Sequence, residues 1–205
     1  MKIQYMGTAA AEGWPALFCT CDACRRAKAL GGKNIRTRSQ VLIDEELLVD
    51  FPPDSYLHML RDGLDLPSIR HILITHTHQD HLFLEDLALR CEWFTNGLEG
   101  ILTLYGNDKL VRKYEAYLGT EKYHSLTRKW LASRELVPYV PVKIGKHMVT
   151  PMLANHDKTE CCYIYLLERD GKTMLYGNDT GIFPEEVWKY LTGRHLDVVS
   201  LDCTM

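Results

Sequence analysis

The sequence predicts an α/β fold, a four-layered αββα sandwich of two mixed sheets with helices on the outer faces. Two observations lead to this class. Hairpin patterns dominate the first part of the chain, and strands alternate with helices over the last two-thirds, which suits a layered arrangement. In addition, chemically active side chains follow directly after apolar strands at 76–81, 156 and 179. We therefore expect a functional site along one edge of the sandwich, where strand ends collect.

Length and composition indicate one domain spanning residues 1–205, with 46% hydrophobic and 25% charged residues. The net charge of −3 shows no excess of positive charge that would attract a nucleic acid. No apolar run approaches the roughly 20 residues that cross a bilayer, and the N-terminus lacks a signal-peptide pattern. Seven cysteines without an export signal are typical of reduced thiols. We therefore expect a cytoplasmic protein with neither a membrane nor a nucleic acid as partner.

The first elements are a strand at 2–6, a small-residue loop at 7–13 and a helix at 25–30. Three cysteines, Cys19, Cys21 and Cys24, lie between the loop and the helix. Cys-x-x-Cys spacing lets two thiolates bind one ion, so the cluster predicts a structural zinc. A fourth ligand would have to come from elsewhere, and three unpaired thiols are the alternative interpretation.

A basic link follows, in which Arg36 and Arg38 either contact a substrate phosphate or belong to a solvated edge strand. Residues 41–44 and 47–50 form a predicted hairpin. A short helix is expected at 55–61.

The most informative segment is an apolar strand at 72–75 that is followed directly by His76, His78, Asp80 and His81. Imidazole and carboxylate ligands together suit zinc, manganese or iron. His76 and His78 are two residues apart, so an extended backbone points both to one side. The chain must then turn to place Asp80 and His81 at an adjacent position, which suggests two metals. Packing is a poor alternative, because each buried group would need its own polar partner.

The remaining elements follow from periodicity and capping. A helix is predicted at 82–93, with Leu84, Leu87, Ala88 and Cys91 on its buried face. Asn107 or Asp108 caps a helix that ends near Leu118. The other predicted elements are a strand at 101–105, a helix at 121–134, strands at 139–144 and 148–153, a hairpin of 161–167 with 173–176, and a last strand at 196–202.

The motif His76-x-His78-x-Asp80-His81 after a hydrophobic strand resembles the signature of the metallo-β-lactamase fold superfamily of metal-dependent hydrolases. The resemblance implies that His156, at the end of the 148–153 strand, completes the first metal site with His76 and His78. His147 is the rival histidine, but it stands at the start of that strand. Asp80 and His81 would hold a second metal.

The resemblance also implies that Asp179 bridges the two metals, although alone it could simply cap the helix that starts near Pro184. His195 precedes the last strand and therefore lies at the wrong edge for catalysis.

Within the superfamily, the Cys19-x-Cys21-x-x-Cys24 segment resembles the one found at this position in the phosphoribosyl cyclic phosphate phosphodiesterase of the carbon–phosphorus lyase pathway and its relatives. This resemblance implies a phosphodiesterase that acts on a small cyclic or nucleotide-like substrate. Two divalent metals, zinc or manganese and about 3.5–4 Å apart, would hold a bridging hydroxide. Asp80 and Asp179 would be the catalytic carboxylates, with a structural zinc at the cysteines. Two alternatives remain, a tRNA 3′-end-processing endonuclease and a non-catalytic accessory protein stabilised by zinc.

Relatives continue beyond the Asp202-Cys203-Thr204 stretch and supply a last histidine for the second metal and another for the cysteine site. We therefore expect the sandwich to lack its C-terminal elements. Apolar surface left uncovered there would favour a homodimer.

Overall fold

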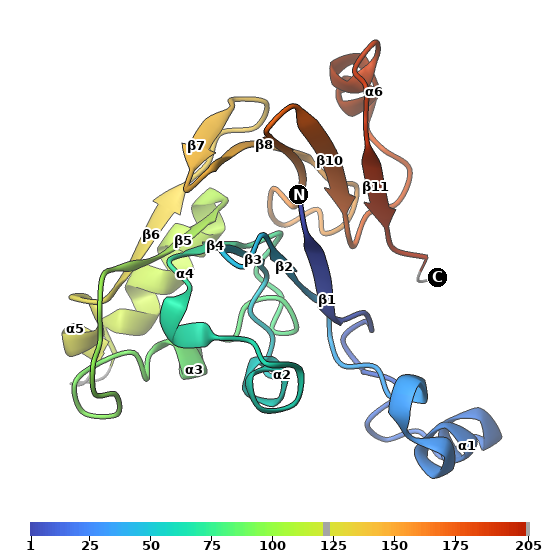
Figure 1. Ribbon diagram of the computed structural model, residues 1–205, viewed down its shortest axis with the longest axis vertical. Coiled ribbons are helices and arrows are strands. Elements are labelled where there is room, and N and C mark those ends of the chain that lie inside the picture. Colours follow the sequence, from blue (N-terminus) through green and yellow to red (C-terminus); the bar gives the residue numbers. More distant parts are fainter. Residues whose placement is uncertain (121–123, 204–205) are drawn as a thin grey trace.

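The computed structural model describes residues 1–120 and 124–203, in which two sheets face each other (Figure 1). The first sheet has the order β1-β2-β3-β4-β5-β6 and the second β11-β10-β9-β8-β7. The strands of the first sheet are β1 (Ile3–Gly7), β2 (Gln40–Ile43), β3 (Leu47–Val49), β4 (His71–Leu73), β5 (Leu102–Gly106) and β6 (Leu131–Glu135). Those of the second are β7 (Val142–Ile144), β8 (His147–Leu153), β9 (Tyr163–Arg169), β10 (Lys172–Gly177) and β11 (Val198–Leu201).

Both sheets are mixed, as predicted. The β1–β2–β3 part is antiparallel, and β3 to β6 run parallel. In the second sheet β7 to β10 are antiparallel and only β11 is added in parallel. The helices are α1 (Asp22–Leu30), α2 (Ser55–Asp62), α3 (Leu84–Leu87), α4 (Asp108–Leu118), α5 (His124–Thr127) and α6 (Glu185–Leu191), with short 3-10 turns η1 (Gly32–Asn34) and η2 (Leu66–Ser68).

Three hydrophobic clusters separate the four layers. Because strand side chains alternate, Val41 and Ile43 of β2 join the cluster between the sheets, whereas Leu42 joins the cluster beneath the helices. Leu110 of α4 packs into the cluster beneath the helices. A third cluster joins the outer face of the second sheet to Val187 of α6. The αββα prediction is therefore confirmed.

The predicted helix at 82–93 is too long, because α3 covers only Leu84–Leu87. Its predicted inward residues are nevertheless buried: Leu84, Leu87, Ala88 and Cys91. The carbonyl of Ala88 accepts a hydrogen bond from the Thr127 hydroxyl, so a tertiary partner serves the backbone where the helix ends.

The helix predicted at 121–134 is wrong in its second half. Residues 121–123 lie outside the described residues, and α5 covers only His124–Thr127. Leu131–Glu135 forms strand β6 instead, paired in parallel with β5 from Leu102 to Gly106. The open edge of β5 offers a ladder of hydrogen bonds, and that tertiary context outweighs the local helical pattern.

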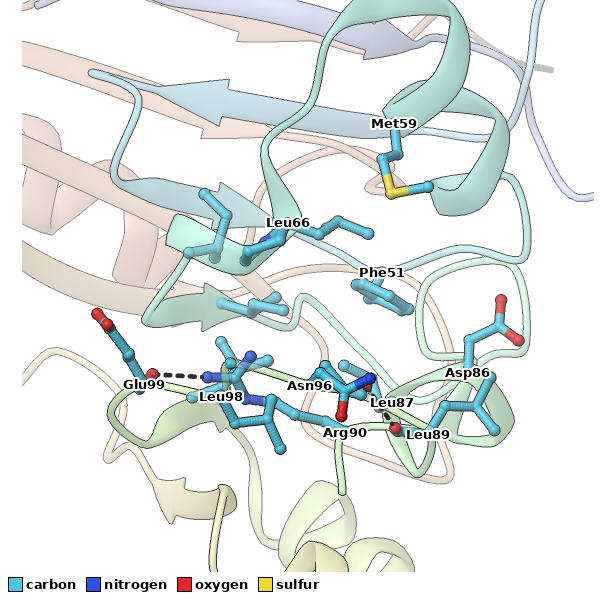
Figure 2. Close-up of a pocket in the computed structure, with 16 residues that line it drawn as sticks. Phe51, Met59, Leu66, Asp86, Leu87, Leu89, Arg90, Asn96, Leu98 and Glu99 are labelled. Carbon is cyan, nitrogen blue, oxygen red and sulfur yellow. Dashed lines mark hydrogen bonds between the residues drawn. The ribbon is translucent and has the colours of Figure 1, made fainter. Parts of the chain in front are cut away.

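A cavity of about 240 Å³ lies on the helical side of the first sheet, between α2–η2 and the segment that follows α3 (Figure 2). Its lining is largely apolar and includes Phe51, Leu66 and Leu87, while Arg90 donates hydrogen bonds to the carbonyls of Glu99 and Gly100. None of the site residues predicted from the sequence lines this cavity.

Candidate metal centre

The predicted ligands gather where strands of both sheets end. His76, His78, Asp80 and His81 follow β4 of the first sheet, and His156 and Asp179 follow β8 and β10 of the second. Asp179 has a positive φ of 50°, a conformation that aspartate tolerates better than most residues. The two sheets therefore contribute to one cluster at a shared edge.

Three imidazoles and a carboxylate form the first group. His78 Nδ1 lies 2.9 Å from His76 Nε2 and 3.4 Å from His156 Nε2. Asp179 Oδ2 lies 3.8 Å from His76 Nε2 and 3.9 Å from His156 Nε2. The ligand nitrogens of His76, His78 and His156 all lie within 4.8 Å of one another, and Asp179 Oδ2 borders two of them. The three histidines therefore have the arrangement that a metal ion needs.

A second group shares the same aspartate oxygen. His81 Nε2 lies 2.8 Å from Asp179 Oδ2 and 3.2 Å from Asp80 Oδ2. His76, His81 and Asp179 offer ligand atoms that all lie within 4.8 Å of one another, whereas Asp80 joins through His81 alone. The position of Asp179 Oδ2 between the groups suits a bridging ligand.

The distances within the first group are of the size that metal coordination requires. Ligands 2.0–2.1 Å from a tetrahedral ion are about 3.3–3.4 Å apart, and the contacts of the first group bracket that value. The imidazole and carboxylate donor set is suited to zinc, manganese or iron. Both groups thus have the chemistry and spacing to hold a divalent cation.

His78 is oriented by a carboxylate that sequence analysis missed. Its Nε2 lies 3.1 Å from Asp157 Oδ2, so the Nε2–H donates there and Nδ1 keeps a free lone pair toward the cluster. Asp157 itself accepts hydrogen bonds from the N–H and hydroxyl of Thr159, which lower its pKa to about 2. The only sequence signal was its position directly after His156.

His81 is oriented in the same way by Asp50, a second residue that sequence analysis missed. Asp50 is fully buried beneath the site, and its Oδ2 lies 2.7 Å from His81 Nδ1. The N–H and hydroxyl of Thr75 donate to the same carboxylate. The ring of His81 therefore presents Nε2 to Asp80 and Asp179.

Burial and neighbouring charges set the protonation states. Burial lowers the pKa of His76 to about 2, so its lone pair is available near neutral pH. Burial opposes ionisation of Asp80, yet its hydrogen bond with His81 lowers its pKa to about 2. Burial would also lower the pKa of His81, but Asp50 and Asp179 raise it well above its usual value. A metal at His81 Nε2 would therefore displace a proton.

The rival histidines lie away from the cluster. His147 is fully buried at the start of β8, and its Nε2 lies 2.9 Å from Asp44 Oδ2. His195 is exposed and faces Asp197. Of the two alternatives for the first group, the structure brings only His156 to His76 and His78.

The cysteine cluster is a separate site on the arm that carries α1 (Figure 1). The sulfurs of Cys19, Cys21 and Cys24 lie within 4.8 Å of one another, and no fourth ligand among the described residues joins them. Cys21 is the N-cap of α1 and accepts from the N–H of Cys24. That N–H and the thiol of Cys19 lower the pKa of Cys21 to about 7, which favours a thiolate.

The two predicted arginines differ in their surroundings. Arg38 Nη1 lies 3.1 Å from Asp54, and Arg38 Nε donates to the Ala11 carbonyl, so its guanidinium has structural partners. Arg36 is exposed, and no described residue pairs with its guanidinium. Arg36 also lines a cavity of about 240 Å³ that contains Asp179. Of the two predicted arginines, Arg36 is therefore the one whose guanidinium is available to a ligand.

Comparisons with known proteins agree with this architecture. Residues 47–205 match the family model described as a β-lactamase superfamily domain. No curated protein matches the sequence. None of the helices in the described residues has the length and apolarity to cross a membrane.

Several solved structures share the fold. Zn²⁺-bound PqqB from Methylobacterium extorquens has a TM-score of 0.75 at 18% identity, over 98% of this chain and 72% of that one. A diphosphatase from the PhnP family has a TM-score of 0.72 at 24% identity, over 96% and 72% of the two chains. The short form of human tRNase Z has a TM-score of 0.63 at 16% identity, over 97% and 76%. At these identities the similarity shows the fold alone.

Proposed function

Because this chain belongs to the β-lactamase superfamily domain family, we propose that it is a metal-dependent hydrolase that cleaves phosphodiesters. The observation that carries the proposal is the position of Asp179 Oδ2, within 2.8 Å of His81 and 3.8 Å of His76, between two groups of metal-ligating side chains. The first ion would bind His76, His78 and His156. The second would bind Asp80 and His81, with Asp179 shared.

Two divalent ions in such a site polarise a phosphoryl oxygen and lower the pKa of water enough to make it a nucleophile near neutral pH. The chain's own groups do the rest. Asp80 is ionised at neutral pH and can orient the attacking water by accepting its hydrogen bond. His78, Asp80, His156 and Asp179 line an open cavity of about 390 Å³, which gives a small substrate access to the ligands.

Two observations favour a phosphodiester over other substrates. Arg36 is an unpaired guanidinium in a cavity that shares Asp179 with the metal groups, and guanidinium binds phosphate through paired hydrogen bonds. In addition, two proteins with the same fold are a PhnP-family diphosphatase and a tRNase Z. The metal ligands alone would serve thioester or lactam hydrolysis equally well.

The test is a substrate panel with zinc or manganese supplied. We expect hydrolysis of bis(p-nitrophenyl) phosphate and of a nucleoside 2′,3′-cyclic phosphate, abolished by a chelator and restored by metal. A thioester, a β-lactam and a precursor tRNA complete the panel. Turnover of the thioester or the β-lactam without any phosphodiester would contradict the proposal. Turnover of precursor tRNA without either small phosphodiester would assign the site to tRNA processing instead of small substrates.

Arg36 gives a prediction about substrate binding. Replacing it with alanine removes a charge-assisted contact worth about 1.5 kcal/mol, so we expect the KM for a phosphodiester to rise about tenfold with little change in kcat. Steady-state kinetics measures both constants. The matched control is Arg38→Ala, which breaks the pair with Asp54 and should lower thermal stability without raising KM. Equal KM values for wild type and Arg36→Ala would remove Arg36 from the substrate site.

A further inference from the structure

The loop between β8 and β9 does more than supply His156. It also carries Asp157, which orients His78, and Glu160, whose side chain has no exposed surface. A buried carboxylate is costly unless every oxygen is well paired. The hydrogen-bond partners of Glu160 therefore indicate which part of the chain it fixes in place.

Four donors saturate the Glu160 carboxylate. Oε1 accepts from the Thr77 hydroxyl at 2.9 Å and lies 3.3 Å from Lys109 Nζ. Oε2 accepts from the Thr77 N–H at 3.0 Å and from Asn107 Nδ2 at 2.8 Å. Two of the three hydrogen bonds thus come from Thr77, the residue between His76 and His78, and Lys109 adds an ion pair.

Thr77 is held at its third polar group as well. Its carbonyl accepts a hydrogen bond of 2.6 Å from Lys113 Nζ of α4. The backbone that joins the two histidines is therefore fixed from Glu160 on one side and from α4 on the other. Because His76 and His78 project from this backbone, a shift of Thr77 would move both ligand nitrogens.

We propose that Glu160 is a positioning residue for the metal centre, which grips Thr77 and thereby aims His76 and His78 at the ion that His156 completes. The inference rests on the proposed metal-dependent function. The same loop supplies one ligand and positions the other two, so the relative placement of ligands from the two sheets is fixed by Glu160 and Asp157. A purely structural role is the competing explanation, because Asn107, a partner of Glu160, also caps α4 by accepting from Leu110.

The test measures zinc affinity on folded protein by competition with a chelator, so it does not depend on activity. Outer partners of metal ligands typically contribute 10–100-fold to affinity, and we expect a loss in that range for Glu160→Ala. Glu160→Asp keeps the charge but withdraws the carboxylate from Thr77, so its zinc affinity should also fall. This variant provides the test if Glu160→Ala does not fold. The matched control is Lys158→Ala, on the same loop, whose side chain donates to Asn155 and contacts neither Thr77 nor the histidines among the described residues.

Cobalt substitution separates the sites, since only the cysteine cluster gives thiolate-to-cobalt charge-transfer absorption. In a Cys21→Ala background, the d–d bands that remain without that absorption report the histidines. A wild-type histidine cluster that binds no metal would contradict the proposed function. Metal binding by wild type, with Glu160→Ala and Glu160→Asp folded and within twofold of Lys158→Ala, would overturn only the positioning role. A selective loss in the two Glu160 variants, with circular dichroism unchanged, would support it.

Discussion

Replacing His156 with alanine is expected to lower kcat/KM for phosphodiester hydrolysis about 10³-fold, equivalent to about 4 kcal/mol of transition-state stabilisation. The physical reason is that His156 Nε2 closes the first group, 3.4 Å from His78 Nδ1 and 3.9 Å from Asp179 Oδ2. Without it, an ion at that point keeps only two imidazoles and a shared carboxylate. Kinetics on bis(p-nitrophenyl) phosphate, together with the metal content of the variant, measures the effect.

His147→Ala is the matched control, because it removes an imidazole from the other end of the same strand. His147 is fully buried and paired with Asp44, so its loss should cost about 2 kcal/mol of unfolding free energy. It should leave metal content and kcat/KM close to wild type once the protein is folded. If His147→Ala removed activity and metal while His156→Ala did not, the assignment of the first site would be wrong.

The second large effect is expected at Asp50, which lies beneath the site and touches no substrate. Asp50→Asn keeps the shape of the side chain but replaces one acceptor oxygen with an N–H donor. If the amide oxygen accepts from the Thr75 N–H, as Asp50 Oδ1 now does, the amide nitrogen faces His81 Nδ1. His81 must then turn its Nδ1 lone pair to the amide and carry its proton on Nε2, which disables Nε2 as a ligand.

We therefore expect Asp50→Asn to lose affinity selectively at the second metal position, by about 100-fold, with the first position retained. Metal titration followed by calorimetry resolves the two binding events. Asp54→Asn is the control, since Asp54 pairs with Arg38 and is no partner of His81. Two unchanged binding events in a folded Asp50→Asn protein would show that Asp50 does not set the His81 tautomer.

The fold could be predicted from the sequence because its signals are local. A short apolar run marks strands such as β2, and the Asp170-Gly171 turn marks the β9–β10 hairpin. The metallo-β-lactamase fold that the His76–His81 motif suggested is confirmed by the family model and by the solved structures. The individual ligand assignments stay predictions, although the structure brings His76, His78, His156, His81 and Asp179 together.

What could not be predicted depends on contacts between distant residues. Asp50 looked like the end of a hairpin strand, and only the parallel pairing of β3 with β4 brings it under His81. Glu160 looked like a loop residue, and its hydrogen bonds with Thr77, 83 positions away, form only when the β8–β9 loop meets that residue. The helix predicted over Leu131–Glu135 was wrong for a related reason. This segment forms a strand because it pairs with the edge of β5, and its own periodicity does not indicate one.

The most direct test is the metal content of the purified chain, wild type beside His78→Ala and Cys21→Ala, after zinc or manganese is supplied. The account predicts divalent metal in the wild type that His78→Ala loses and Cys21→Ala retains, with any cysteine-bound zinc lost only in the latter. A folded wild-type protein that holds no metal, or one whose metal content is unchanged by His78→Ala, would contradict the claim that this edge is a metal centre.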